Sequence, residues 1–247
     1  MLLSNKKKFI SIDIPKTGTK TLRHIFKTTG FVDIYGVDWL SYNEKIKNTN
    51  IAFLKRINPS INPIFYQHST SKDIENNIKK HKLNFPSCSI LDVENYKKFC
   101  FIRKPLQRYL SFLNYSKQSQ KKYLEEEDIS LEEYHQGKSC HAFFSKHKDP
   151  KSAFVRMIEK ELPQSEFIFD ENDNLVVDWI FNFHEFEKEV HKLFKILDIN
   201  QTPVMLESNV SQKYFKLQDV ISDEAINLCT QKEKLLNQLK LDFSLDD

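Results

Sequence analysis

The sequence lacks the features that mark membrane-spanning, secreted and disulfide-stabilised proteins. It has no run of about 18 uncharged apolar residues, the length that a transmembrane helix needs. Met1-Leu2-Leu3 is followed at once by Ser-Asn and three lysines, so we expect no signal peptide. The four cysteines, at positions 88, 100, 140 and 229, form no short paired motif and suit reduced thiols. These absences favour a cytoplasmic protein without an integral membrane segment.

An excess of charge of one sign is also missing. The chain has 37 Lys and Arg against 34 Asp and Glu, a formal net charge of +3. The lysines occur as scattered pairs and one triplet separated by acids, which argues against a nucleic-acid-binding stripe. The mild positive charge favours a small anionic partner instead. No pattern indicates an oligomeric state.

The 247 residues show no internal repeat, no low-complexity linker and no sharp change of composition, so we expect a single domain over residues 1–247. Four short apolar segments have the pattern of strands: Phe9–Ile14, Phe31–Tyr35, Ile64–Gln67 and Phe99–Ile102. Helical patterns begin near Thr19, Thr70 and Pro105. This alternation predicts an α/β fold with a central parallel sheet flanked by helices.

The rest of the chain predicts further helices in the middle and at the C-terminus. The polar stretch of about residues 117–160 is either a helical insertion on the acceptor side or a plain exposed helix pair. Residues 166–180 have the pattern of strand, turn and strand. Glu185–Leu197 predicts an amphipathic helix, and the final helix is expected from a Ser222 cap to about Leu239.

The most informative segment runs from Phe9 to Leu22. An apolar, β-branched strand breaks at Pro15-Lys16-Thr17-Gly18 and is followed by an amphipathic helix. A loop of this kind places backbone N–H groups and a helix N-terminus where a phosphate or sulfate can bind. The alternative is a plain turn in which glycine supplies a permissive φ.

This loop differs from the loop of nucleotide-triphosphate-binding proteins. Aligning Lys20-Thr21 with the end of that G-x-x-x-x-G-K-[ST] pattern puts Ile14 and Thr19 where the two glycines belong. The more telling lysine is therefore Lys16, which precedes Gly18 and approaches the anion from the strand side. There it can lie near a leaving-group oxygen.

A second segment has the same organisation. Phe99–Ile102 leads into Arg103-Lys104-Pro105, and Pro105 suits the first turn of a helix. Arg103 at the end of the strand and Ser111 on the helix can bind one phosphate, with a charge-assisted fork and a hydroxyl. Arg108 lies three residues before Ser111 and shares its face of the helix. The alternative is that Arg103 and Arg108 are surface charges.

The two segments together resemble the paired signatures of the sulfotransferases that use 3′-phosphoadenosine 5′-phosphosulfate (PAPS). Ile14–Leu22 is similar to the 5′-phosphosulfate loop of the carbohydrate branch, and Arg103–Ser111 to its 3′-phosphate segment. Gln67–Ile74 resembles a segment that the branch often carries between these two motifs, and weaker similarities cover residues 177–184 and Ser208–Lys213. Asp13 stands where the branch often has histidine.

The resemblance implies a P-loop-like sulfotransferase fold, PAPS as donor and a hydroxyl acceptor, which in this branch belongs to a glycan. It implies a catalytic role for Lys16 and donor binding by the following residues: Lys16, Thr17, Gly18, Thr19, Lys20, Thr21, Arg103, Ser111 and Lys213. For Lys20, exposure to solvent is the open alternative.

His68 is the candidate general base. It lies between a strand-like run and Thr70-x-x-Asp73, which has the capping-box pattern of a helix start. Side chains at the carboxyl ends of strands face ligands in α/β sheets, and histidine titrates near neutral pH. A structural hydrogen-bonding role is the alternative.

The remaining histidines show no paired metal-ligand spacing, so we expect no metal site. Two other functions stay open at this point. One is a metal-dependent kinase, for which Asp92 or Asp178 follows an apolar run. The other is a catalytically silent nucleotide-binding or interaction protein.

Overall fold

The three-dimensional structure, a computed structural model, describes residues 2–4, 6–30, 34–35, 70, 72–74, 76, 95–125, 149–205 and 212–239, with the backbone alone at 34–35 and 120–125. The chain divides into two compact units. The sheet unit comprises Met1–Ile102 and Ser165–Ser208, and the helical unit comprises Arg103–Gln164 and Asn209–Asp247. That the whole chain forms one domain stays a prediction.

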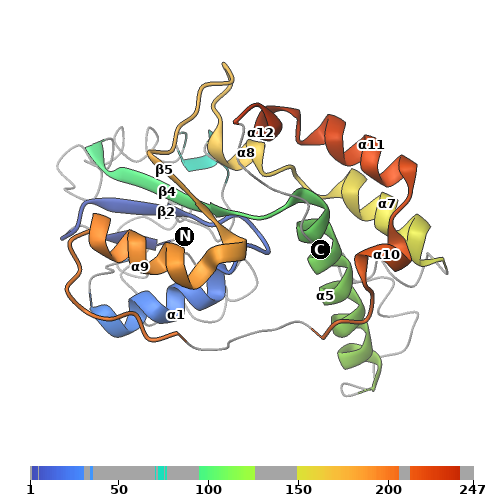
Figure 1. Ribbon diagram of the computed structural model, residues 1–247, viewed down its shortest axis with the longest axis horizontal. Coiled ribbons are helices and arrows are strands. Elements are labelled where there is room, and N and C mark those ends of the chain that lie inside the picture. Colours follow the sequence, from blue (N-terminus) through green and yellow to red (C-terminus); the bar gives the residue numbers. More distant parts are fainter. Residues whose placement is uncertain are drawn as a thin grey trace, which may run out of the picture. The chain divides into compact units, whose positions relative to one another are not determined.

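The sheet unit contains a five-stranded sheet in the order β3-β1-β2-β4-β5; Figure 1 labels its neighbouring strands β2, β4 and β5. The strands are β1 (Leu2–Ser4), β2 (Phe9–Ile12), β3 (Ile34–Tyr35), β4 (Lys97–Ile102) and β5 (Trp179–Asn182). The neighbours β2, β4 and β5 are parallel, whereas β1 is antiparallel to both β2 and β3. The predicted α/β class with a mostly parallel sheet is therefore confirmed.

The predicted strands at Phe9–Ile14 and Phe99–Ile102 correspond to β2 and β4, while the segment near Phe31–Tyr35 contributes only the short β3. The expected strand at Ile64–Gln67 lies outside the described residues. Strand β1 was missed, because three residues are too few to show an alternating pattern. It pairs with β2 as a hairpin with Ser4 opposite Phe9.

Both faces of the central strands are buried. Phe9 and Phe99 lie on one face, and the next residues, Ile10 and Cys100, lie on the other and are equally inaccessible to solvent. Parallel strands covered on both faces consist of nearly continuous apolar residues rather than alternating ones. This explains why the apolar residues of β2 and β4 do not alternate with exposed polar ones.

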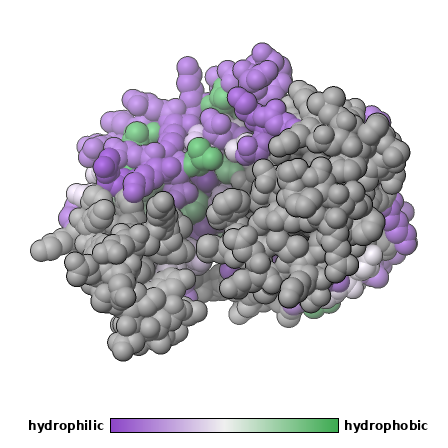
Figure 2. Space-filling view, turned by 180° about the vertical axis from the view of Figure 1, so that it is seen from behind, coloured by the Kyte–Doolittle hydropathy of each residue, from purple (hydrophilic) through white to green (hydrophobic). Residues whose placement is uncertain are grey.

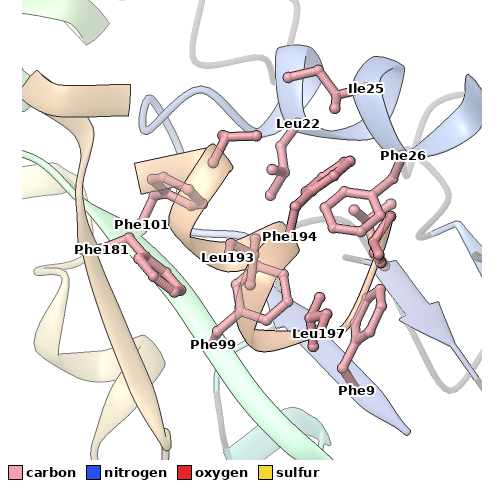
Figure 3. Close-up of a cluster of buried hydrophobic side chains, with 13 residues drawn as sticks. Phe9, Leu22, Ile25, Phe26, Phe99, Phe101, Phe181, Leu193, Phe194 and Leu197 are labelled. Atoms are coloured by element: carbon pink, nitrogen blue, oxygen red, sulfur yellow. The ribbon is translucent and has the colours of Figure 1, made fainter. Parts of the chain in front are cut away.

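Helices α1 (Thr19–Thr29) and α9 (Phe186–Ile196) lie side by side over one face of the sheet (Figure 1). Figure 3 shows their apolar side chains meeting the phenylalanines of the strands. Phe26 of α1 lies between Phe9 and Phe194, with ring centroids 5.3 Å away in each case. Burying a phenylalanine contributes about 1.5–3 kcal/mol, so this cluster holds α1 and the loop before it against the sheet.

Helix α9 confirms the helix predicted at Glu185–Leu197. The residues of its expected apolar stripe are all buried: Val190, Leu193, Phe194 and Leu197. One element nearby was predicted wrongly, since residues 165–168, where a strand was expected to begin, form the short helix α8 (Ser165–Ile168). The N–H of Phe169 donates to the carbonyl oxygen of Ser165 at 3.0 Å, a hydrogen bond between residues four apart that is characteristic of an α-helical turn.

The helical unit consists of α5 (Pro105–Glu125), α7 (Pro150–Lys160), α10 (Leu217–Val220), α11 (Asp223–Lys232) and α12 (Lys234–Gln238). Its core joins apolar residues of α5, α7, α10 and α11. The start at Pro105 is as predicted. Asp149 caps α7 by accepting a hydrogen bond of 2.9 Å from the N–H of Ser152. Within the expected insertion of residues 117–160, the described parts are helical, and a role as a lid stays a prediction.

The final helix begins at the predicted Ser222 cap, whose hydroxyl accepts a hydrogen bond from the N–H of Ala225 at 3.2 Å. It does not run unbroken to Leu239, because α11 ends and α12 begins around Glu233. Glu233 is fully buried. A carboxyl group that is fully buried requires hydrogen-bond partners in the interior.

The described part of the face in Figure 2 is mainly hydrophilic, with scattered hydrophobic residues. Single exposed apolar side chains such as Leu175 and Val204 are normal on a protein surface. Among the helices that the structure describes, none has both the length and the apolar character to cross a membrane.

Candidate active site

The loop between β2 and α1 has two residues with positive φ. Lys16 has φ 70°, and Gly18, the residue before α1, has φ 79° and ψ 15°. Left-handed residues of this kind occur in the backbone concavities that bind anions. The predicted sequence of strand, loop and helix is thus present, and its glycine is at a position where positive φ requires it.

Gly18 packs directly under two aromatic rings. A Cβ atom at this position would lie 2.7 Å from Cε2 of Phe183 and 2.9 Å from Cε2 of Phe186. Phe183 belongs to a 3-10 turn (Phe183–Glu185) after β5, and Phe186 begins α9. The late segment around residues 177–184, which only weakly resembled a family motif, therefore helps to fix the shape of the loop.

Three threonines, in the loop and in the first turn of α1, have side chains that are buried or half-buried. The Thr17 hydroxyl donates a hydrogen bond to the carbonyl oxygen of Ile14 at 2.8 Å, and the Thr17 side chain is buried. Thr19 is also buried, and Thr21 is half-buried in the first turn of α1. The Thr17 side chain is thus used to close the loop, whereas its N–H remains the group expected to bind the donor.

The start of α1 suits a negative ligand. The first helical hydrogen bond runs from the N–H of Leu22 to the carbonyl oxygen of Gly18 at 2.9 Å. Gly18 has no side chain to cap the helix, and the first turn contains no acidic residue. Helix N-termini carry a partial positive charge from their N–H groups. Lys16 and Lys20 add positive charge here; Lys16 is half-buried and Lys20 is exposed.

A buried ion pair spans the loop and was missed in the sequence. Asp13, which follows β2 directly, accepts hydrogen bonds from the guanidinium of Arg23 on α1, one of them from Nε at 3.1 Å. The Ser11 hydroxyl donates to Asp13 at 3.3 Å. Burial alone raises the pKa of the Asp13 carboxyl, but nearby positive charges, that of Arg23 among them, outweigh it and lower the pKa.

The Asp13–Arg23 pair neutralises the one carboxylate that the described part of the loop contains. An anion at this loop is therefore not opposed by an uncompensated negative charge. The available signal was an acid after the strand and an arginine ten residues later, one helical turn into α1. Such a pair is too common to be singled out without the fold.

Arg103 is the residue that follows β4, and β4 runs parallel to its neighbour β2. Both sequence motifs thus follow strands that end at the same edge of the sheet. The backbone of Arg103 is held at two points by Gln164: its N–H donates to Oε1 at 2.9 Å, and its carbonyl oxygen accepts from Nε2 at 2.8 Å. Burial lowers the pKa of Arg103 to about 10, so the side chain stays charged at neutral pH.

A family model described as "Sulfotransferase family" matches residues 1–244. The chain belongs to the sulfotransferase family. No curated protein and no solved structure matches the chain significantly. The match extends over both units and both motifs. The recognition made from Ile14–Leu22 and Arg103–Ser111 is thereby confirmed, and with it a transferase of sulfuryl groups.

In this sulfotransferase, Arg108 is not the surface charge that one interpretation of the sequence allowed. It is fully buried, with Nη1 3.6 Å from Oε1 of Glu233 and Nη2 donating to the carbonyl oxygen of Leu162 at 2.9 Å. The reason is that Glu233, 125 residues further along the chain, supplies the opposite charge in the same interior. Ser111, one turn along α5, is half-buried.

Two further predicted residues of the sulfotransferase are less defined. Lys213 is exposed, and the residues after it are held by Asn114, whose Oδ1 accepts from the N–H groups of Tyr214 and Phe215 at 2.9 Å each. His68 lies outside the described residues. Both assignments stay predictions.

The capping box after His68 is formed. The N–H of Thr70 donates to Oδ2 of Asp73 at 3.0 Å, and the N–H of Asp73 donates to the Thr70 hydroxyl at 3.2 Å. The predicted helix start near Thr70 is therefore present.

Asp178 does not suit the role of a kinase acid. It precedes β5 rather than following a strand, and it pairs with Lys97 at 2.7 Å and accepts from the N–H of Lys98 at 2.8 Å. It therefore lies at the sheet edge opposite the loop. Asp92, the other candidate, lies outside the described residues. Within the part of the chain that is described, no three His, Cys, Asp or Glu side chains gather as metal ligands would; independence from metals stays a prediction.

Proposed function

We propose that this sulfotransferase moves a sulfuryl group from PAPS to a hydroxyl group of a carbohydrate by direct in-line transfer. The observation that carries the proposal is the loop before α1. Lys16 and Gly18 have left-handed backbone conformations, the helix start has no acidic residue, and the adjacent carboxylate of Asp13 is already paired. The family match supports the same assignment.

The loop is proposed to bind the 5′-phosphosulfate. Its contacts would come from the N–H groups of Thr17, Gly18 and Thr19 and from the hydroxyls of Thr19 and Thr21, with Lys20 adding charge. Arg103 and Ser111 are proposed to bind the 3′-phosphate, with Lys213 as a further basic residue. An arginine that keeps its charge and has a fixed backbone suits recognition of a phosphate.

The reaction forms a bond between the acceptor oxygen and sulfur while the bond from sulfur to the phosphate oxygen breaks. Adenosine 3′,5′-bisphosphate leaves. Lys16 is proposed to neutralise the charge that develops on the departing oxygen, and His68 to accept the proton of the acceptor hydroxyl. Like phosphoryl transfer, such a step depends mostly on positioning and charge stabilisation, and a general base contributes typically 10²–10⁴-fold in rate.

Binding experiments separate this proposal from a kinase. Calorimetric titration of the protein should show binding of adenosine 3′,5′-bisphosphate without a divalent cation and no comparable binding of ATP with Mg²⁺. The reverse result would favour a kinase. Transfer of radiolabelled sulfate from PAPS to a panel of glycans and lipids then tests the carbohydrate acceptor. Bisphosphate binding without any transfer would indicate a silent binding protein.

A cytoplasmic location stays a prediction from the reduced cysteines.

Lys16 provides the mutational test. Lys16→Ala should abolish sulfate transfer, because the negative charge on the leaving oxygen loses its partner. The matched control is Lys27→Ala, which removes an exposed lysine from the last turn of α1, the helix that follows the loop; this variant should transfer sulfate normally. Normal turnover by Lys16→Ala would refute the role of this residue.

A further inference from the structure

The carboxylate of Glu233 is the centre of a buried hydrogen-bond network in the helical unit. Glu233 is fully buried between α11 and α12. Its oxygens accept hydrogen bonds from the N–H of Gln164 at 3.0 and 3.2 Å and from the hydroxyl of Tyr109 at 3.1 Å. Arg108 supplies the opposite charge 3.6 Å away. A carboxylate with this many partners is fixed in position.

The network holds the segment 162–164 from two sides. Arg108 Nη2 donates to the carbonyl oxygen of Leu162, and Glu233 accepts from the N–H of Gln164. The guanidinium of Arg108 is itself placed near the rings of Tyr109 and Phe112, at 5.3 and 5.1 Å from their centroids. The backbone of Gln164 therefore has little freedom to move.

The side chain of Gln164 in turn holds the backbone of Arg103. Gln164 is fully buried, and its amide uses both its oxygen and its nitrogen on the backbone of that one residue, at 2.9 and 2.8 Å. A pair of hydrogen bonds to the N–H and C=O of the same residue fixes the orientation of its backbone, and hence the direction in which the side chain leaves it.

We propose that Gln164 and Glu233 are positioning residues that orient the Arg103 side chain toward the 3′-phosphate of the donor. This inference rests on the proposed function, in which Arg103 binds that phosphate. Gln164 acts on Arg103 directly, and Glu233 acts through Gln164. Neither is proposed to touch the donor.

The distinguishing measurement is selectivity for the 3′-phosphate. Adenosine 3′,5′-bisphosphate and adenosine 5′-monophosphate differ only by this group, so the ratio of their dissociation constants reports on the Arg103 contact. A general loss of stability changes both constants alike and leaves the ratio unchanged. Both constants are measured by calorimetry on the full chain.

The main variant is Gln164→Met, which keeps the length of the side chain and removes both hydrogen bonds to Arg103. We expect bisphosphate binding to weaken about ten-fold while monophosphate binding stays within about two-fold. Arg103→Ala should remove most of the preference, since only Ser111 and Lys213 would then remain for the 3′-phosphate. Asp149→Ala removes the cap of α7 in the same unit and should lower stability without changing the ratio. If Gln164→Met does not fold, Gln164→Glu is measured in its place.

The outcomes separate this inference from the proposed function. A wild-type protein that does not prefer the bisphosphate overturns both. A wild-type preference that the Gln164 variant retains in full overturns the positioning role alone. Loss of the preference in the Gln164 variant but not in Asp149→Ala supports it. Glu233→Gln should then reduce the preference for the bisphosphate by a smaller factor, because Glu233 contacts Gln164 and not Arg103 itself.

Discussion

Replacing Gly18 with alanine tests how the loop before α1 is shaped. Two costs add. The backbone has φ +79°, and a left-handed conformation costs a residue with a Cβ atom about 1–2 kcal/mol. The new Cβ would also lie 2.7 Å from Phe183 and 2.9 Å from Phe186. Overpacking of this kind costs about 1–3 kcal/mol, so Gly18→Ala should lower the free energy of unfolding by about 2–5 kcal/mol.

The chain provides a matched control in Gly30, which follows α1. Its φ is +67°, but no atom lies within 4 Å of a Cβ built there. Gly30→Ala therefore measures the backbone cost alone, about 1–2 kcal/mol. The difference between the two variants isolates the contact of Gly18 with the phenylalanines. Urea denaturation of each variant, followed by circular dichroism, gives the free energies.

A double-mutant cycle identifies the partner. Phe183→Ala removes the closer ring, so in its background Gly18→Ala should cost about 1–2 kcal/mol less than in the wild-type protein. Sulfate transfer by Gly18→Ala should fall more than its stability explains, because the displaced loop also carries Lys16. The reasoning is refuted if Gly18→Ala is no more destabilising than Gly30→Ala, or if Phe183→Ala leaves its cost unchanged.

Three further predictions concern buried or capping contacts. Asp13→Asn should lower the free energy of unfolding by about 3 kcal/mol at pH 7. The pKa of Asp13 is lowered from 3.8 in the folded protein, so this stabilisation is complete above 3.8 and is lost as pH falls through the folded value; a cost that persists undiminished in acid would contradict the assignment. Arg108→Met should cost about 3–5 kcal/mol in the same assay, since it leaves the buried Glu233 carboxyl without its opposite charge, and adding Glu233→Gln should recover part of this cost; no recovery would argue against the ion pair. Ser222→Ala should cost about 1 kcal/mol, and a melting temperature equal to that of the wild-type protein would contradict the cap.

Local sequence signals determined the elements that carry the two motifs. Strand β2, the loop at Lys16 and the start of α1 follow from an apolar run, a turn residue with positive φ and an amphipathic helix, all within Phe9–Leu22. The start of α5 at Pro105 and the cap at Ser222 are equally local. Such features depend on neighbouring residues, whose spacing the sequence displays directly.

Tertiary structure alone decided which polar side chains are buried and what they hold. Nothing in the sequence links Gly18 to Phe183, Arg108 to Glu233 or Gln164 to Arg103, because the partners are separated by 165, 125 and 61 residues along the chain. A charged side chain in a helix has the same local pattern whether it faces water or an interior partner. Only the path of the chain brings the opposite charge or the clamping amide to it, and that path is fixed by packing rather than by propensity.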